Sequence, residues 1–264
     1  MVANDSMNEA DGKYRAPALE KGLDIIELLA GHADGRTQAE IAKALGRSVN
    51  EIYRMLTVLV QRGYVSKTPD GDRFQLSMKL FTLSHRHPPL RRLVDQATPL
   101  LREAVEVANQ SAHIGIHDRG EIVVAAMAQS PENWGLSMRV GAVIGLYNTG
   151  TGRILAAFAS SDKRAGIIRE HELVAGETQM DSNEFDDILD RIVARGYEDM
   201  PSETTVGVTN LSFPIFGPDN EAVAALTCPY LQRIDVSDSP DISGVTEIFA
   251  DVARRLSMSH GARE

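Results

Sequence analysis

The sequence TQAEIAKALGRSVNEIYRMLTVLVQRGYV, at residues 37–65, carries two helix-start signals in close succession. Each is a capping box, in which a Ser or Thr side chain accepts a hydrogen bond from the backbone of a following Glu, and the Glu side chain reaches back to the cap. The two boxes are Thr37 with Glu40 and Ser48 with Glu51. They predict a short helix and then a longer one.

Glycines close both predicted helices, because glycine most easily adopts the left-handed conformation at a helix end. Gly46 follows the first helix and Gly63 follows the second. The longer helix also has a stripe of apolar residues, which predicts its buried face. The residues of this stripe are Val49, Ile52, Leu56 and Leu59.

The flanking segments complete the order of elements. Residues 19–30 predict an earlier helix. Two alternating segments at 64–67 and 73–76 flank a Pro-Asp-Gly-Asp turn at 69–72, which predicts a hairpin. Three helices followed by a two-stranded wing form a winged helix-turn-helix domain, whose third helix enters the major groove of DNA. The residues expected to bury the first helix are Leu19, Leu23, Ile26 and Ala30.

The polar residues of the third helix, the turn and the wing are candidates for DNA contacts. Asn pairs with adenine, Arg with guanine, and Glu accepts from cytosine, whereas Lys and Arg at the edges bind phosphates. The alternative is an ordinary solvated helix face. The order of capping boxes, turn and wing favours DNA binding. The predicted DNA-binding residues are Thr37, Gln38, Lys43, Arg47, Ser48, Asn50, Glu51, Tyr53, Arg54, Thr57 and Arg73.

The net charge of -10 opposes DNA binding at first sight, because Lys and Arg supply most of the affinity for phosphates. The charge is unevenly distributed. Residues 13–76 contain ten Lys and Arg against eight Asp and Glu, whereas residues 77–264 contain seventeen against twenty-six. The acidity therefore belongs to the second part of the chain.

The composition predicts a cytoplasmic protein without a membrane partner. No stretch is long and apolar enough for a membrane span, and residues 1–11 are polar and acidic, unlike a signal peptide. The single cysteine, Cys228, lies in an apolar run and predicts a buried thiol. We expect no cofactor, no metal-binding residues and no catalytic residues, because the common nucleophile, phosphate and zinc motifs do not occur.

Several motifs resemble the isocitrate lyase regulator (IclR) family of bacterial transcription factors. In the first part these are ALEKGLDIIELL at 18–29, AEIAKALG at 39–46 and IYRML at 52–56. In the second part they are the helical segment 93–108 and GEIVV at 120–124. The head of the third helix departs from the family, with Ser-Val-Asn-Glu where Pro-Lys-Ser-Thr is frequent, so the resemblance implies no operator sequence.

The resemblance implies an α+β protein with two domains. A tail at 1–15 would precede a winged helix-turn-helix domain at 16–77, and a linker helix at 78–89 would lead to a GAF-like (profilin-like) effector-binding domain at 90–264. The periodicity of the second part agrees with this. It predicts helices at 90–108, 150–159, 163–170, 185–195 and 245–257, and strands at 111–117, 122–128, 134–140, 206–215 and 221–229.

A second candidate site lies at 148–153, where Asn-Thr-Gly-Thr-Gly-Arg precedes an apolar helical segment. Small residues at a helix N-terminus allow an anion to approach backbone N–H groups. An ordinary loop and cap is the alternative. The resemblance places the effector, a carboxylate or aromatic acid, at this loop and on two strands. The residues implied are Trp134, Tyr147, Gly150, Thr151, Met200, Val208, Asn210, Thr227 and Pro229.

Together these features predict a ligand-responsive transcriptional regulator, either repressor or activator. A homodimer, or a dimer of dimers, would bind a palindromic double-stranded operator because one short helix covers only a half-site. Two alternatives remain open at this point. The second domain could be an enzyme that uses Cys228 or a histidine, or the first domain could bind a protein instead of DNA.

Overall fold

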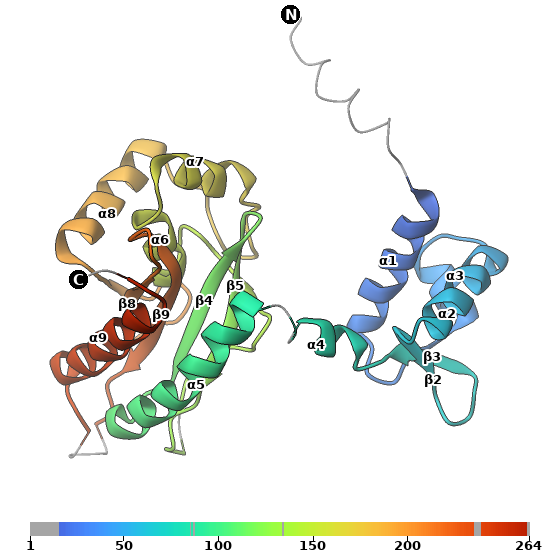
Figure 1. The fold of residues 1–264 in the computed structure, drawn as a ribbon, viewed down its shortest axis with the longest axis horizontal. Coiled ribbons are helices and arrows are strands. Elements are labelled where there is room, and N and C mark those ends of the chain that lie inside the picture. The colour runs from blue at the N-terminus through green and yellow to red at the C-terminus, as the bar shows by residue number, and fades with distance from the viewer. Residues whose placement is uncertain (1–15, 85, 87, 134, 235–238, 263–264) are drawn as a thin grey trace, which may run out of the picture. The chain divides into compact units, whose positions relative to one another are not determined.

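The structure is a computed structural model that describes residues 16–84, 86, 88–133, 135–234 and 239–262 (Figure 1). The expected tail at 1–15 lies outside the described residues. The chain divides between His87 and Pro88 into two compact units. Each unit has hydrophobic core clusters of its own.

The first unit is a winged helix-turn-helix fold. Its three short antiparallel strands pair in the order β1-β3-β2. The pair β2–β3 is the predicted wing, while β1, which precedes α2, was not predicted. The elements are α1 (Pro17–Ala30), β1 (Arg36–Thr37), α2 (Gln38–Ala44), α3 (Val49–Gln61), β2 (Val65–Lys67), β3 (Arg73–Leu76) and α4 (Lys79–Ser84).

Both predicted capping boxes form. The Thr37 backbone N–H donates to Glu40 Oε2 at 2.8 Å, and the Ser48 backbone N–H donates to Glu51 Oε2 at 3.2 Å. Each cap side chain accepts from the N–H of its Glu in return. The caps fix where α2 and α3 begin, and so which side of α3 packs on the core. The core of this unit consists of Ile25, Leu29, Ile41, Ala42, Ile52, Leu56, Val65 and Phe74.

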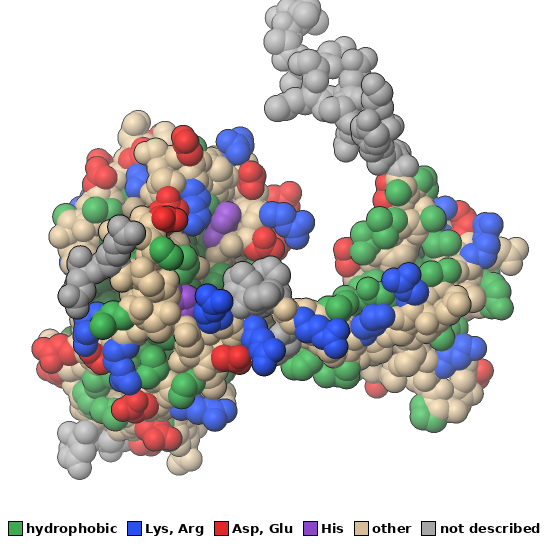
Figure 2. Space-filling model, viewed as in Figure 1, with side chains coloured by type: hydrophobic (Ala, Val, Ile, Leu, Met, Phe, Trp, Pro, Cys, Tyr) green, Lys and Arg blue, Asp and Glu red, His purple; other side chains and the backbone are tan. Residues whose placement is uncertain are grey.

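The predicted buried face of α1 was wrong. Leu19 is 63 % exposed and Leu23 is 47 % exposed, whereas Ile25 and Leu29 are buried. Both pairs have the four-residue spacing of a helix face, so periodicity alone did not separate them. Val49 at the start of α3 was also expected inside and is 49 % exposed. Figure 2 shows hydrophobic side chains on the surface of this unit.

The second unit has a six-stranded antiparallel sheet between two layers of helices, so the protein is α+β (Figure 1). The strand order is β6-β5-β4-β9-β8-β7. Helices α5 and α9 cover one face, and α6, α7 and α8 cover the other. The elements are α5 (Pro88–Ala108), β4 (Ala112–Asp118), β5 (Glu121–Ala128), β6 (Val143–Ile144), α6 (Gly150–Ala157), α7 (Ser161–Glu170), α8 (Ser182–Arg195), β7 (Glu198–Pro201), β8 (Val208–Phe216), β9 (Ala222–Leu231) and α9 (Ile242–Ser259).

One predicted strand does not form. Residues 135–139 have no regular secondary structure, and the strand β6 follows at Val143–Ile144. The edge strand β7 was not predicted, because its four residues Glu198–Pro201 include two acidic side chains and a proline. Among the described residues, no helix is long and apolar enough to cross a membrane.

We expect Leu56→Ala in α3 to lower the free energy of unfolding of the first unit by about 2–5 kcal/mol, because it leaves a cavity in that core. Leu56 is 1 % exposed. Calorimetry on the full chain should show the transition of the first unit at lower temperature and that of the second unit unchanged. Val58→Ala, on the exposed side of the same helix, is the matched control. An equal shift in both variants would contradict this assignment of the core.

Candidate functional site

The side of α3 that faces away from the core presents unengaged polar groups. Asn50, Tyr53 and Arg54 are exposed, and their side chains make no hydrogen bond or ion pair with another described residue. Lys43 on α2 is exposed in the same way. Arg47, in the turn between the two helices, lies 3.9 Å from an Asp24 carboxylate oxygen, and both side chains are largely solvated. These five residues remain available to DNA, since a solvated ion pair is weak.

Other predicted DNA-binding residues are engaged within the unit. Thr37 and Ser48 cap helices. Gln38 Nε2 donates to the Val49 carbonyl at 2.9 Å, and Thr57 Oγ1 donates to the Tyr53 carbonyl at 2.8 Å. These side chains shape the turn and α3, and their predicted contacts with DNA would come second to that role.

Arg73 and Glu51 are also held by neighbours. Arg73 Nη1 donates to the Gly35 carbonyl at 3.1 Å and lies 3.4 Å from Glu40 Oε2. Lys21 Nζ donates to Glu51 Oε1 at 2.6 Å. This bond, with those from Ser48, lowers the pKa of Glu51 from 4.5 to about 2. A pairing of Glu51 with cytosine would require these contacts to break.

The second unit contains a cavity of about 320 Å³ at the N-terminus of α6. It is bounded by β4, β8 and β9 and by segments near 136–145, 174–175 and 202–205. Of the residues predicted to contact an effector, those that line it are Gly150, Thr151, Val208, Asn210, Thr227 and Pro229.

Two predicted effector residues, Tyr147 and Met200, do not line this cavity, and a third lies outside the described residues. The Tyr147 ring packs edge-on against the rings of His171 and Phe185, at centroid distances of 5.7 and 4.9 Å. Met200 is buried in β7. Trp134 lies outside the described residues.

A buried chain of hydrogen bonds forms the floor of the cavity. The strand register places both His113 of β4 and Ser212 of β8 opposite Thr227 of β9. Thr227 Oγ1 donates to Ser212 Oγ at 2.9 Å and lies 2.8 Å from Thr151 Oγ1. The Thr151 Oγ1 in turn lies 3.1 Å from His113 Nε2. Because each hydroxyl has one hydrogen, Thr227 accepts from Thr151, and Thr151 accepts from the Nε2–H of His113.

The His113 imidazole in this chain of hydrogen bonds is neutral. Complete burial lowers the pKa of His113 from 6.5 to about 4, because a charged ring would lose its hydration. The sequence offered His113 only as one of the histidines that an enzyme could use, and did not place it among the effector residues. The register that brings it to Thr227 became visible only in the folded sheet.

The first turn of α6 lies very close to the sheet. A Cβ on Gly150 would stand 2.2 Å from Ser212 Oγ, so glycine is required there by packing as well as by any ligand. Thr149 caps the helix by accepting from the Gly152 N–H at 3.0 Å. The N–H groups of Gly150 and Thr151 have no hydrogen-bond partner among the described residues and lie in the cavity wall. This N-terminus can therefore receive an anion or a carbonyl oxygen.

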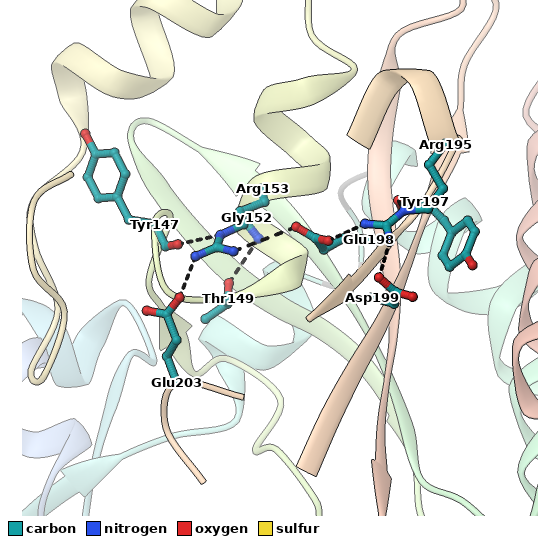
Figure 3. Close-up of polar contacts among 9 residues, drawn as sticks. All are labelled: Tyr147, Thr149, Gly152, Arg153, Arg195, Tyr197, Glu198, Asp199 and Glu203. Atoms are coloured by element: carbon teal, nitrogen blue, oxygen red, sulfur yellow. Dashed lines mark hydrogen bonds and ion pairs between the residues drawn. The ribbon is translucent and has the colours of Figure 1, made fainter. Parts of the chain in front are cut away.

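Arg153 on α6 makes polar contacts with Tyr147, Glu198 and Glu203 (Figure 3). Its Nε donates to the Tyr147 carbonyl at 2.7 Å, and its Nη2 donates to Glu203 Oε1 at 2.6 Å. Its Nη1 lies 3.8 Å from Glu198 Oε2. The other oxygen of this carboxylate, Oε1, lies 2.8 Å from Arg195 Nη2. Burial raises the pKa of Glu198 although both guanidiniums oppose this rise. Glu203 thus fixes to α6 the segment that supplies Ser202 to Thr205 of the wall.

The cavity itself has little formal charge. Among the described side chains that line it there is no Lys, Arg, Asp or Glu, and its one histidine is neutral. Within the same described part of the chain, no cluster of three His, Cys, Asp or Glu side chains could hold a metal ion.

Comparison with known families decides the relationship. Residues 18–69 match the family described as "IclR helix-turn-helix domain", and residues 90–258 match "Bacterial transcriptional regulator IclR C-terminal". The chain belongs to the IclR family. The resemblance seen in the sequence is therefore confirmed, and the protein is a DNA-binding transcriptional regulator with the helix-turn-helix and C-terminal domains of that family.

Named IclR relatives align over most of the chain. The "HTH-type transcriptional regulator BhcR" of Paracoccus denitrificans is 28% identical over 94% of this chain and 88% of its own. The "Glycerol operon regulatory protein" of Streptomyces griseus is 26% identical over 93% and 96%. Both are described as regulators, in keeping with the helix-turn-helix found here.

Solved structures of the family share the fold. The IclR of Thermotoga maritima matches with a TM-score of 0.71 at 22% identity, covering 92% of this chain and 98% of that one. An IclR homolog from Microbacterium hydrocarbonoxydans, complexed with 4-hydroxybenzoate, matches with a TM-score of 0.76 at 18% identity, covering 91% and 98%.

We expect Glu51→Gln to destabilise the first unit in a pH-dependent way. The folded-state pKa of about 2 lies below the ordinary 4.5, so the contribution of the carboxylate is present above pH 4.5 and is lost as the pH falls toward 2. The melting-temperature difference between wild type and Glu51→Gln should be largest between about pH 5 and 7 and shrink below about pH 4.5.

The control for this series is Glu27→Gln, which removes an exposed α1 carboxylate that makes no ion pair with another described residue. A difference for Glu51→Gln that stays constant across the pH range would show that Lys21 and Ser48 do not hold the charged form.

Proposed function

We propose that this protein binds a palindromic operator in the cytoplasm as a homodimer, and that a small monocarboxylic acid in the α6 cavity sets its operator affinity. No cofactor takes part. The observation that carries the proposal is a cavity with no Lys, Arg, Asp or Glu among its described lining residues, which ends on N–H groups of a helix N-terminus that have no partner among those residues, in the C-terminal domain of a helix-turn-helix regulator. The Microbacterium homolog is complexed with 4-hydroxybenzoate, which is itself a monocarboxylic acid.

The operator-reading residues are those that the fold leaves unengaged. Asn50, Tyr53 and Arg54 are assigned to base edges and Lys43 and Arg47 to phosphates. Arg73 is a weaker candidate for a phosphate, because Glu40 already neutralises part of its charge. The acidic second unit does not oppose this, since the contacts come from the first unit.

The size of the site and exposed apolar surface both support dimerisation. One recognition helix covers only a half-site, so a two-fold dimer is needed to read a palindrome. Leu19 and Leu23 of α1 are exposed in the single chain, and exposed apolar groups of this kind mark protein interfaces. We assign α1 to the contact between the two winged domains; dimers of dimers would need further contacts.

The cavity favours one negative charge on the ligand. A helix N-terminus carries about half a positive charge, which stabilises one carboxylate. A second carboxylate or a phosphate would find no cationic side chain among the described lining residues and would be buried unpaired. Apolar lining by Leu136, Met138, Val143, Val174 and Pro229 suits an aliphatic or aromatic body.

Cys228 and His113, the candidate reactive groups among the described residues, are unsuited to catalysis. Cys228 is completely buried in the core between the sheet and α5 and α9, and burial raises the pKa of its thiol far above the ordinary value. His113 Nε2 is occupied by Thr151. We therefore assign binding and not turnover to the second unit. The effector then changes operator affinity only by the difference between its affinities for the two states of the regulator.

We expect Arg54→Ala to weaken operator binding by roughly 1–3 kcal/mol and to relax the preference at one base pair per half-site, because a bidentate base contact is lost. The operator is obtained by selection from random duplexes, and binding is measured by fluorescence anisotropy on single-base variants. Arg191→Ala removes the same charge from α8 and should leave binding unchanged. Unchanged sequence preference in Arg54→Ala would refute the base contact, and absence of any selected duplex would favour a protein partner.

We expect Thr227→Val to lower effector affinity by roughly 1–3 kcal/mol while operator binding without effector is kept, because Thr151 and Ser212 lose a shared partner in the cavity floor. The probe is the monocarboxylic acid that most raises the melting temperature of the full chain, and affinity is measured by calorimetry. Thr246→Val, on α9 away from this cavity, is the control. Wild-type affinity in Thr227→Val would place the effector elsewhere.

A further inference from the structure

Asn148 is a polar side chain in the cavity wall, and at least one of its two amide atoms has no hydrogen-bond partner among the described residues. The residue is 7% exposed and lines the cavity, next to Thr149 and the α6 N-terminus. Its Oδ1 is buried without a hydrogen bond. Its Nδ2 makes no hydrogen bond to another described residue. An unpaired buried amide destabilises a fold, so such groups point to a missing partner. Asn148 was not among the effector residues implied by the sequence.

The surroundings of Asn148 determine which amide atom faces the cavity. A Cβ on Gly145 would lie 2.0 Å from Asn148 Oδ1 and 2.8 Å from Glu177 Oε1, so both oxygens face one small space above Gly145. The Glu177 carboxylate is fixed there, since it accepts from the Tyr147 N–H at 2.7 Å and the Val174 N–H at 3.0 Å. Two acceptors side by side repel each other.

A half-turn of the Asn148 amide relieves this repulsion. The amide nitrogen and oxygen are almost equal in size, so the side chain occupies the same volume in either orientation. After the turn, Nδ2 faces the Glu177 carboxylate as a donor, and Oδ1 faces the cavity as an acceptor. The cavity then contains a fixed acceptor close to the free N–H groups of α6.

We propose that Asn148 determines effector specificity by accepting a hydrogen bond from a hydroxyl group of the effector, and that the effector is a 2- or 3-hydroxy monocarboxylic acid. This rests on the proposed function, in which the α6 N-terminus binds the carboxylate. The Cα atoms of Asn148 and Gly150 are at most about 7 Å apart, because Gly150 follows Asn148 by only two positions. We therefore expect the effector to carry its hydroxyl group within a few atoms of its carboxylate.

Other polar groups of the wall are less suited to this role. The Thr151 and Thr227 oxygens already accept hydrogen bonds, from His113 and from Thr151 respectively. Thr149 Oγ1 donates to the Gly145 carbonyl at 2.6 Å. Asn210, the other amide of the cavity, is only partly buried, so water can satisfy it when no ligand is bound.

The same arrangement rejects close analogues. A 2-oxo acid would present a carbonyl oxygen to Asn148 Oδ1, and an unsubstituted acid would leave the amide unpaired. A site built to bind a hydroxyl group discriminates strongly against a ligand that lacks it, because the buried partner is left without a hydrogen bond.

The test uses the full chain and sets of acids with one carbon skeleton. One set is 3-phenyllactate, phenylpyruvate and 3-phenylpropanoate, a second is lactate, pyruvate and propionate, and a third is 3-hydroxybutyrate, acetoacetate and butyrate. Thermal shift and calorimetry should show that the hydroxy acid of at least one set binds about tenfold or more tightly than its oxo and deoxy counterparts. Asn148→Ala should abolish this ratio by weakening the hydroxy acid alone.

Two further variants keep the result interpretable. Asn148→Ser retains a smaller acceptor and should keep part of the preference for hydroxy acids. This variant provides the test if Asn148→Ala does not fold. Asn210→Leu removes the other amide of the cavity and should keep the ratio between hydroxy and deoxy acid, whatever it does to overall affinity.

The proposal is overturned if oxo or deoxy acids bind as tightly as hydroxy acids, if no hydroxy acid binds, or if the preference survives in Asn148→Ala. In the first and last cases, acids that still change operator affinity leave the proposed function intact. The proposed function itself fails if no monocarboxylic acid changes either the melting temperature or operator affinity.

Discussion

The close approach of the first turn of α6 to the central strands determines the character of the C-terminal domain. It is possible because Gly150 has no side chain where Ser212 lies. It brings the Thr151 hydroxyl into contact with Thr227 and, through it, with the neighbouring strands. The helix N-terminus is thereby held against the floor of a cavity, with its free N–H groups turned inward. A helix seated further from the sheet would expose those groups to water, which would compete with any ligand.

In the DNA-binding domain the same polar residue types divide into two roles. The capping-box residues Ser48 and Glu51 fix the start of α3, and their side chains form the hydrogen bonds of the cap. Asn50 and Arg54 lie on the exposed part of the same helix, and their side chains have no partner among the described residues. The orientation of the exposed residues therefore depends on the capping residues, whose own contacts with DNA stay a prediction. The two groups are interleaved along the chain, and only their hydrogen bonds distinguish them.

The order of elements could be predicted because capping, turns and hydrophobic periodicity are local. Capping boxes fixed both helix starts in the winged domain, and alternation found β4, β5, β8 and β9. Relations across the fold could not be predicted in this way. Residues 135–139 alternate suitably for a strand but have no regular structure, and Leu19 and Leu23 share a helix face that this chain does not bury. Asn148 lay in the candidate loop at 148–153 but received no role of its own, because that role depends on Glu177, which the fold brings near.

The separation into two compact units constrains how an effector can act. The helix α4 lies between the core clusters of the two units in the sequence and buries none of its own residues. Under the proposed function, an effector acts by favouring one form of its own domain. The ion pair between Arg153 and the half-exposed Glu203 is the contact through which the segment 202–205 would respond. The coupling energy cannot exceed the difference in ligand affinity between those forms, so a ligand that binds tightly to both would leave the operator occupied.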